Sequence, residues 1–388
     1  METVDFSKID MGTALIDERS ANTNNIRFGK SNMQDLVNLL KSQKLTTKNY
    51  AIQSTQLHAT VDNNDKLRIS FNDENGKETS ATTNGWATRQ AIAASMGDAT
   101  YHQKMIHAGM FNLAEENINE WWKNKNSTQL LRVMNGTIRA VLGSTYLIVD
   151  NYDILTEIAR QINAINTQRL ADNEQPIVLD RASISEGHAY FELMDTNREY
   201  DIGKGDLFTP MITFRNSDVG GGALGSDVGF FRWACQNMHI KDTIMKKVHR
   251  GERLDPTIYG EEIVAKMSRL WAEAIGKGIE HTMRNNQLFD TWAAEMRESK
   301  EMQITDQKTT LINMQSEFKI NDSEINEINQ LLATDKTILQ EDRGTGFALI
   351  GAMTQAAKRM NTDREHEIAK IAGKLTDDNN RLLAKVIA

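Results

Sequence analysis

Three segments after Tyr50 carry apolar residues at every second position and are rich in β-branched side chains: 52–61, 67–71 and 78–83. Stretches rich in Asn, Asp and Gly separate them, DNND (62–65) and NDENG (72–76), and these residue types supply the backbone conformations of tight turns. We therefore expect a three-strand meander. In residues 86–122 the apolar positions change to helical spacing.

The centre of the chain combines both patterns. Asn135-Gly136, between the apolar stretches 130–134 and 137–149, is a strong hairpin signal. Helical spacing from Ile154 to Ile165 predicts an amphipathic helix. Strands are expected at 177–184, 188–194 and 210–216, and the apolar run 228–240 can form a further strand. Hairpin, helix and meander in this order predict a central antiparallel sheet with helices on one face.

After Pro256 the spacing is helical to the end of the chain, and 347–375 is expected to form one last helix. The polar stretch 300–345 predicts either a helical hairpin or a mobile insertion. The fold class is therefore α+β, with a mainly helical C-terminal region. We expect four parts: a polar N-terminal arm (1–45), a small meander with helices (46–125), the central sheet domain (126–255) and the helical region (256–388).

Composition supports this outline. Only 3 prolines occur among 388 residues, where average usage of about 5% would give nearly twenty, and this scarcity favours long helices. The single cysteine, Cys235, excludes an intramolecular disulfide framework and a Cys-cluster zinc site. No apolar run approaches the roughly 18 residues of a membrane span, and the acidic N-terminus has no signal-peptide pattern. We expect a protein of the cytoplasm that does not enter membranes.

Sequence motifs give no basis for an enzyme. Residues 220–225, GGGALG, match G-x-G-x-x-G, but a dinucleotide site needs a helix next, and a flexible turn or bulge also explains the glycines. The eight histidines show no ligand spacing, so neither metal nor cofactor is expected. Asp150 and Asp153 follow a predicted strand, where capping of the next helix explains them. A catalytic polar cluster of Asp150, Asn151, Arg215 and Asn216 remains an alternative.

Charge is unevenly distributed along the chain. The net charge is −8, and residues 255–327 hold 8 Lys and Arg against 14 Asp and Glu. Basic residues gather around the first central hairpin and in 241–253, where five Lys and Arg face two acids. Such groups near aromatic rings can hold a phosphate backbone while bases stack. The predicted nucleic-acid contacts are Arg132, Arg139, Tyr146, Arg215, Lys246, Lys247 and Arg250.

Several motifs in order resemble the phage/plasmid-like protein family known as domain of unknown function 932. They are Tyr146 with Asp150 and Asn151; Asn216, Ser217 and Gly220; Arg232, Cys235 and Asn237; Thr354, Ala356 and Ala357; and the upstream block 83–106. The chain departs from the family at Asn237-Met238, where Asn-Gly is usual. The resemblance implies an origin in a phage, prophage or plasmid. The order of elements is also similar to single-strand annealing proteins of the Rad52/RecT type.

These observations give a leading hypothesis and an alternative. The first is a non-enzymatic protein that binds and anneals single-stranded DNA in recombination, as a homo-oligomer in the host cytoplasm. The alternative is a protein-interaction or structural role, such as a host-defence inhibitor with an acidic surface, whose partner is a host or phage protein.

Overall fold

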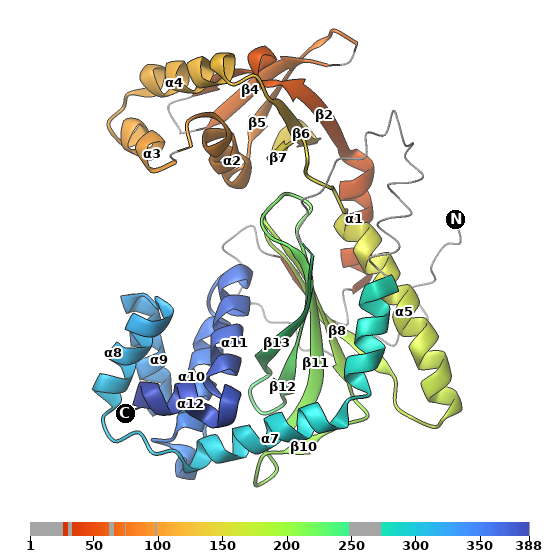
Figure 1. Ribbon diagram of the computed structural model, residues 1–388, viewed down its shortest axis with the longest axis vertical. Helices are drawn as coiled ribbons and strands as arrows, with labels where there is room; N and C mark the ends of the chain where they lie inside the picture. The colour runs from red at the N-terminus through yellow and green to blue at the C-terminus, as the bar shows by residue number, and fades with distance from the viewer. Residues whose placement is uncertain are drawn as a thin grey trace.

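The computed structural model describes residues 26–29, 33–61, 66–73, 75–97, 99–247 and 273–387. An N-terminal sheet, a central sheet and a C-terminal group of helices are its three parts (Figure 1). The N-terminal sheet lies at one end of the central sheet, and the C-terminal helices lie beside the central sheet. The predicted α+β class is confirmed, and so is the mainly helical C-terminal region.

The N-terminal sheet has six strands in the order β2-β6-β7-β5-β4-β3. They are β2 (Thr47–Gln53), β3 (His58–Val61), β4 (Leu67–Asn72), β5 (Glu78–Thr83), β6 (Thr128–Met134) and β7 (Thr137–Gly143). Along β4 the side chains of Leu67, Ile69 and Phe71 are buried, while Arg68 and Asn72 are exposed. The buried row packs against α2 (Gly85–Ser95) and α4 (Phe111–Asn124), with α3 (Ala99–His107) beside them. Helices therefore cover one face of this sheet.

The hairpin β6–β7 belongs to the N-terminal sheet. Asn135 and Gly136 have φ angles of 50° and 75°, as the tight two-residue turn requires. β6 pairs with β2, and β7 runs parallel to β5, which buries Leu131 and Ile138 in the core shared with the first meander. The predicted order of hairpin, helix and meander is observed, but the hairpin and the second meander lie in different sheets. The N-terminal sheet thus crosses the boundary expected at residue 125.

The central sheet is an antiparallel meander in the order β1-β8-β9-β11-β12-β13, with β10 paired to β11. Its strands are β1 (Ile26–Phe28), β8 (Ile177–Ile184), β9 (Ala189–Asp195), β10 (Tyr200–Asp201), β11 (Leu207–Asn216), β12 (Leu224–Arg232) and β13 (Asn237–Lys247). The apolar run 228–240 covers parts of two strands, because a turn at 233–236 divides it, with Gln236 at φ 55°.

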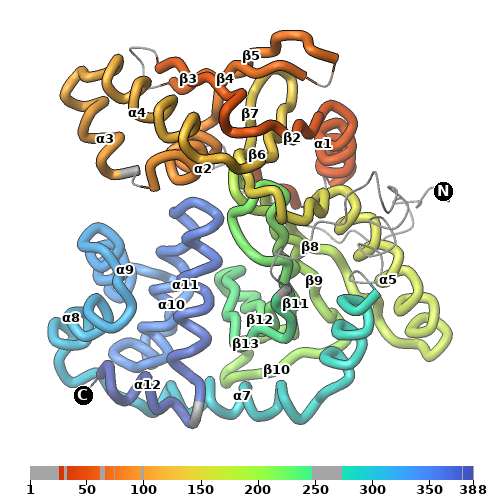
Figure 2. Tube along the Cα trace, turned by 45° about the horizontal axis from the view of Figure 1, so that its top comes forward, coloured from red at the N-terminus to blue at the C-terminus, as the bar shows by residue number. Residues whose placement is uncertain are grey.

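Helices pack on both faces of the central sheet, whereas the sequence predicted them on one face only (Figure 2). On one face lie α1 (Met33–Thr46), α5 (Asn151–Ala171), the helical residues 273–283 and α7 (Asn286–Glu301). Phe191, Phe214 and Phe230 are fully buried beneath them. α11 (Thr362–Leu375) packs on the other face, where Ala369 contacts an apolar cluster that includes Met211 and Ile240.

The C-terminal helices have their own apolar core. Helices α8 (Gln307–Phe318) and α9 (Asp322–Thr334) confirm the helical hairpin as the correct interpretation of 300–345. The prediction of one helix over 347–375 is wrong. α10 (Gly346–Ala357) ends, and α11 starts after Asn361, whose side chain accepts a bond from the amide of Arg364 and so caps a new helix. α12 (Asp377–Ile387) completes the group.

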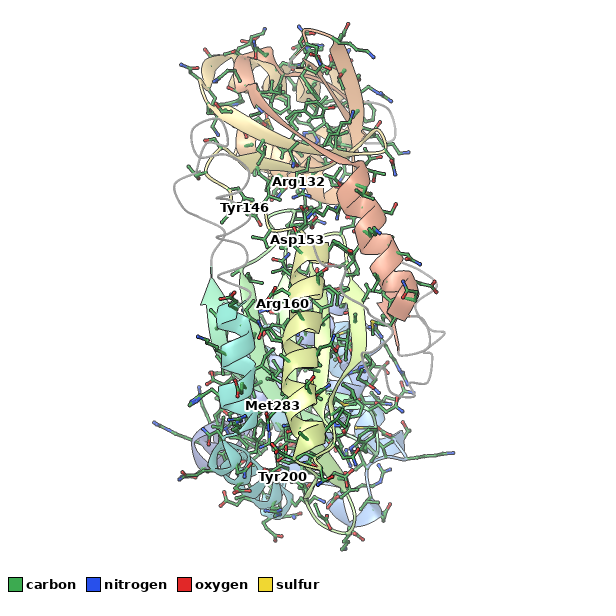
Figure 3. All side chains as sticks on the ribbon, turned by 90° about the vertical axis from the view of Figure 1, so that its right-hand side faces the viewer. Arg132, Tyr146, Asp153, Arg160, Tyr200 and Met283 are labelled. Atoms are coloured by element: carbon green, nitrogen blue, oxygen red, sulfur yellow. The ribbon has the colours of Figure 1, made fainter. Side chains whose placement is uncertain are left out.

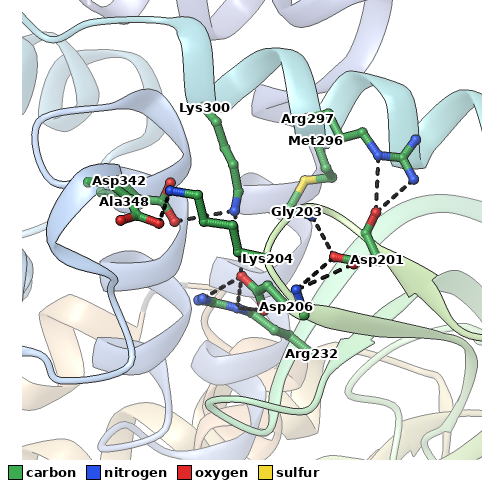
Figure 4. Close-up of polar contacts among 12 residues, drawn as sticks. Asp201, Gly203, Lys204, Asp206, Arg232, Met296, Arg297, Lys300, Asp342 and Ala348 are labelled. Carbon is green, nitrogen blue, oxygen red and sulfur yellow. Dashed lines mark hydrogen bonds and ion pairs between the residues drawn. The ribbon is translucent and has the colours of Figure 1, made fainter.

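A buried ion-pair network fastens these helices to the central sheet (Figure 4). Arg232 in β12 donates from Nε and Nη2 to Asp206 at 2.8 and 2.7 Å, and Nη2 also donates to the carbonyl of Thr337. Lys300 in α7 lies 3.3 Å from Asp342. Both cations lie over the ring of Phe347, at 4.9 and 4.4 Å from its centroid. Their charges are therefore neutralised where the two parts meet.

Gly373 lets α11 approach β13 closely. A Cβ there would lie 1.9 Å from the carbonyl oxygen of Ile240, whereas one at the helical Gly278 would meet nothing within 4 Å. We expect Gly373→Ala to lower the free energy of unfolding by roughly 1–3 kcal/mol. Gly278→Ala should be neutral or stabilise by up to about 1 kcal/mol. Urea unfolding of both variants measures the difference, and equal stabilities would contradict this packing.

Candidate nucleic-acid interface

Two of the predicted contact residues, Arg132 in β6 and Arg139 in β7, lie between the two sheets; Figure 3 shows Arg132 there. Arg132 Nη2 is 2.6 Å from Asp150 Oδ1 and 3.4 Å from Asp218 Oδ2. Arg139 Nη1 is 3.2 Å from Asp218 Oδ2. Asp150 precedes α5 and Asp218 follows β11, so these ion pairs join the N-terminal sheet to the central part.

A register shift in the hairpin brings both arginines to this place. Arg132 pairs with Ala140 and Val133 with Ile138, which leaves Arg139 as the extra residue of a β-bulge. A bulge redirects the side chain of its extra residue. Arg139 can therefore reach the same carboxylate as Arg132, although the two residues lie on different strands.

Two asparagines complete this junction cluster, which we define as Arg132, Arg139, Asp150, Asn151, Asn216 and Asp218. Asn151 Nδ2 donates to Asp218 Oδ1 at 3.2 Å, and Asn216 Nδ2 donates to Asn151 Oδ1 at 2.7 Å. The capping predicted for Asp150 is wrong: it precedes α5, but its carboxylate accepts no bond from the helix and instead pairs with Arg132. Asp153 pairs with Lys44.

Burial determines what these groups can contact. Arg132 is 1% exposed, Arg139 7% and Asp218 5%. Each guanidinium neutralises a carboxylate inside the protein, so neither faces solvent as a phosphate contact requires. Tyr146 is half-buried among Leu130, Leu142 and Val219, and its hydroxyl donates to the carbonyl of Ser217 at 2.5 Å. Burial, and then the nearby Asp218, raise its pKa.

Arg215 lies apart from this cluster because neighbouring residues of a strand point to opposite faces. Asn216 faces the junction cluster, whereas Arg215 Nε donates to Asp227 Oδ2 at 2.9 Å, and its Nη1 donates to the carbonyl of Ala223. The alternative polar cluster of Asp150, Asn151, Arg215 and Asn216 is thus only partly assembled: three members meet and Arg215 does not.

Asp227 is the centre of a second group, the Asp227 cluster, which comprises Arg215, Asp227, Thr243, His366 and Lys370. The carboxylate is fully buried; besides Arg215 it is contacted by His366 Nε2 at 2.9 Å, Lys370 Nζ at 2.8 Å and the hydroxyl of Thr243. Burial alone would raise its pKa, but the His366 bond and the charge of Arg215 outweigh it, and the pKa is lowered. This cluster joins α11 to β11, β12 and β13.

The glycine motif at 220–225 packs between parts of the chain. A Cβ at Gly220, whose φ is 80°, would lie 2.5 Å from Leu142 Cδ2, and one at Gly222 would lie 2.6 Å from His188 Nε2. The strand β12 begins at Leu224, where a dinucleotide motif requires a helix. The glycines therefore permit close packing at the junction, in agreement with the turn interpretation.

The last three predicted contacts lie at the end of β13. Lys246 is exposed, opposite Gly225 in β12. For Lys247 the structure describes the backbone, as the final residue of β13. Arg250 lies outside the described residues.

A surface that sequence reasoning missed lies on the N-terminal sheet, on the face opposite α2 and α4. Thr60, Arg68, Thr82 and Thr137 are paired across β3, β4, β5 and β7, and His58, Ser70 and Ser80 form the next row. Residues paired across strands share a face. We call these seven residues the polar face. None of these seven is a carboxylate, and every side chain can donate a hydrogen bond; an acid, Glu78, follows in the next row, opposite Asn72.

A cavity of about 560 Å³ opens on the polar face. It is lined by Thr60, Val61, Lys66, Arg68, Thr82, Thr83 and Thr137. Within the described residues Arg68 forms no ion pair; its contact is with Ser80 Oγ at 3.4 Å. The alternation of LRISFN and ETSATT marks these positions in the sequence, but polar residues at alternate positions are also typical of any solvated sheet face.

Other chemistry has little support. Across the part of the chain that the structure describes, no group of three or more His, Cys, Asp or Glu side chains is arranged to hold a metal ion. Cys235 is buried, which raises its pKa. Ser185 accepts bonds from the amides of Gly187 and His188 and donates to Asp363, so it serves as a turn cap.

No protein-family model, curated protein or solved structure matches the chain. The family resemblance therefore remains a prediction. In the described segments no helix has the length and apolar character needed to cross a bilayer.

The junction cluster predicts a large effect of Arg132 on stability. Arg132→Gln leaves the carboxylates of Asp150 and Asp218 short of a buried cation, and breaking such a pair costs about 3–5 kcal/mol. Arg160 of α5 is half-exposed and pairs with Glu157. Its replacement, Arg160→Gln, should change the free energy of unfolding by less than about 1 kcal/mol. Denaturant unfolding tests both. A loss below about 1 kcal/mol for Arg132→Gln would show that the pairs do not hold the junction.

Proposed function

We propose that the chain binds single-stranded nucleic acid through the polar face of the N-terminal sheet and catalyses no reaction on it. The cavity on this face carries the proposal: among the described residues that line it, Lys66 and Arg68 are charged, four are threonines and none is acidic. A surface that offers hydrogen-bond donors and no carboxylates suits an anionic ligand. A phosphate backbone is such a ligand, and it is long enough to extend over both rows of the polar face.

Arg68 is the residue we expect to contact a phosphate. It is exposed and free of carboxylates among the described residues, unlike Arg132, Arg139 and Arg215, whose charges are neutralised internally. The hydroxyls of Thr60 and Thr82, its neighbours across the strands, are placed to bond the same phosphate group. These contacts read no base, so the binding we propose has little dependence on sequence.

The extent of the polar face favours action as an oligomer. The row from Thr60 to Thr137 crosses four strands, a width of about 15 Å at ordinary strand spacing. One chain would then hold only a few nucleotides. We propose that several copies bind one strand together, as an annealing protein of a phage or plasmid would in the host cytoplasm, and this origin is supported by the resemblance in sequence.

One observation favours a protein-interaction role as the second candidate. Tyr101, Met110, Leu113 and Trp121, on or beside α3 and α4, are 42–53% exposed. α3 and α4 are neighbours, and large apolar side chains exposed on adjacent helices are typical of contacts with other proteins. Glu116 and Glu120 are exposed on α4 as well, which suits a partner with basic residues.

The nucleic-acid proposal predicts a specific effect of Arg68. In a fluorescence-anisotropy titration of a labelled oligothymidylate at about 50 mM salt, Arg68→Gln should weaken binding roughly 3- to 10-fold, because one phosphate contact is lost. The slope of log affinity against log salt should fall by about 0.7. The matched control is Arg160→Gln, another exposed arginine, which should bind like the unaltered protein.

Two results would contradict the proposal. The first is no binding by the unaltered protein at this salt concentration. The second is equal affinity of the Arg68→Gln and Arg160→Gln variants, which would place the binding surface elsewhere and favour Lys246 at the end of β13.

A further inference from the structure

α11 is held on the central sheet by a buried carboxylate, Asp227, that is contacted from both sides by cations. Asp227 receives two full cations, Arg215 from β11 and Lys370 from α11, at 2.9 and 2.8 Å. Its remaining contacts are Thr243 of β13 and His366 of α11. The carboxylate therefore has donors on both oxygens, and His366 is the member of this set whose side chain in water titrates nearest to neutral pH.

The surroundings of His366 can be named from each element packed against it. The central sheet presents Arg215 and Asp227, and Tyr190 of β9 stacks on its ring at a centroid distance of 4.6 Å. α11 itself contributes Lys370. His366 is 6% exposed, and its Nδ1 has no hydrogen-bond partner among the residues that the structure describes. Protonation would thus place a third cation on one carboxylate and leave its new N–H unpaired.

The cluster continues to the N-terminal sheet through aromatic rings. Beyond Tyr190 lies His188, at 5.8 Å between centroids, and beyond His188 lies Trp86 of α2 at 6.4 Å. Asp363, at the start of α11, accepts from the Tyr190 hydroxyl and lies 3.1 Å from His188 Nδ1. The side chain of Asp363 is 37% exposed. Protons from solvent can therefore reach the row of rings next to His366 at this residue.

We propose that the Asp227 cluster is a proton-sensitive latch, which holds α11 on the central sheet at neutral pH and releases it in mild acid through His366. The proposal concerns the attachment of the C-terminal helices and does not depend on nucleic-acid binding.

The direction of the effect follows from the proton balance. Burial lowers the pKa of His366 below its ordinary value, and the bond to Asp227 offsets this only in part. A detached α11 would expose His366 with an ordinary pKa of about 6.5, so the detached form binds a proton that the attached form resists. Attachment is then strongest above about pH 6.5 and weakens as the pH falls below it. One such group at pH 5.5 shifts the balance by at most about tenfold, the limit in which the attached form does not protonate.

Hydrogen–deuterium exchange of the full chain tests the latch, after correction for the pH dependence of intrinsic exchange. Between pH 7.5 and 5.5 we expect protection of the α11 peptides to fall several-fold, by up to about tenfold, while α4 in the N-terminal part changes less than about twofold. In His366→Gln the amide can donate to Asp227 but does not titrate, so the loss should shrink to less than about twofold.

A second variant keeps the test decisive if His366→Gln does not fold. Lys370→Met removes one of the two cations that compete with a protonated His366, so it should also reduce the loss of protection in acid. The proposal is overturned if α11 of the unaltered protein is equally protected at both pH values. It is also overturned if the same loss persists in either folded variant.

Discussion

The buried pairing of Arg132 with Asp150 and Asp218 is the constraint on which the arrangement of the sheets depends. A charge taken out of water must meet an opposite charge at short distance, and Arg132 does so only when the N-terminal sheet, the start of α5 and the loop after β11 are together. Lys300 with Asp342 and Asp227 with Lys370 impose the same condition on the C-terminal helices. Buried ion pairs therefore determine how the three parts fit together.

Several residues on which the predicted family resemblance rests are members of these joints. Asp150, Asn151 and Asn216 form the junction cluster, Arg232 binds Asp206, and Asn237 Nδ2 donates to Thr354 Oγ1 at 2.9 Å. Such side chains are fixed by their partners within the chain. The resemblance thus concerns the architecture, and the surface that we propose for binding lies outside its main motifs.

Local patterns predicted the elements, whereas pairing over long distances could not be predicted. Alternation and the Asn135-Gly136 turn located β4, β5 and the hairpin, because these depend on neighbouring residues. That the hairpin joins the first meander depends on which apolar rows meet in space, and the position of Arg139 depends on a bulge without a sequence signal. A sequence does not show which acids face a basic residue. Arg132, Arg139 and Arg215 were therefore predicted as surface contacts although acids neutralise them inside the protein. For the same reason the sequence did not reveal that Arg68 forms no ion pair among the described residues.

The central claim is that the cations of the sheet interior maintain the fold, while the polar face of the N-terminal sheet remains available to an anionic strand. The most direct measurement is a hydrogen-exchange footprint of the full chain with and without an oligothymidylate at low salt. The account predicts slower exchange in the peptides of β3, β4 and β5 and at the start of β7, which carries Thr137, with α5 unchanged. Protection confined to β13 and α11, or no protection in any peptide, would contradict it.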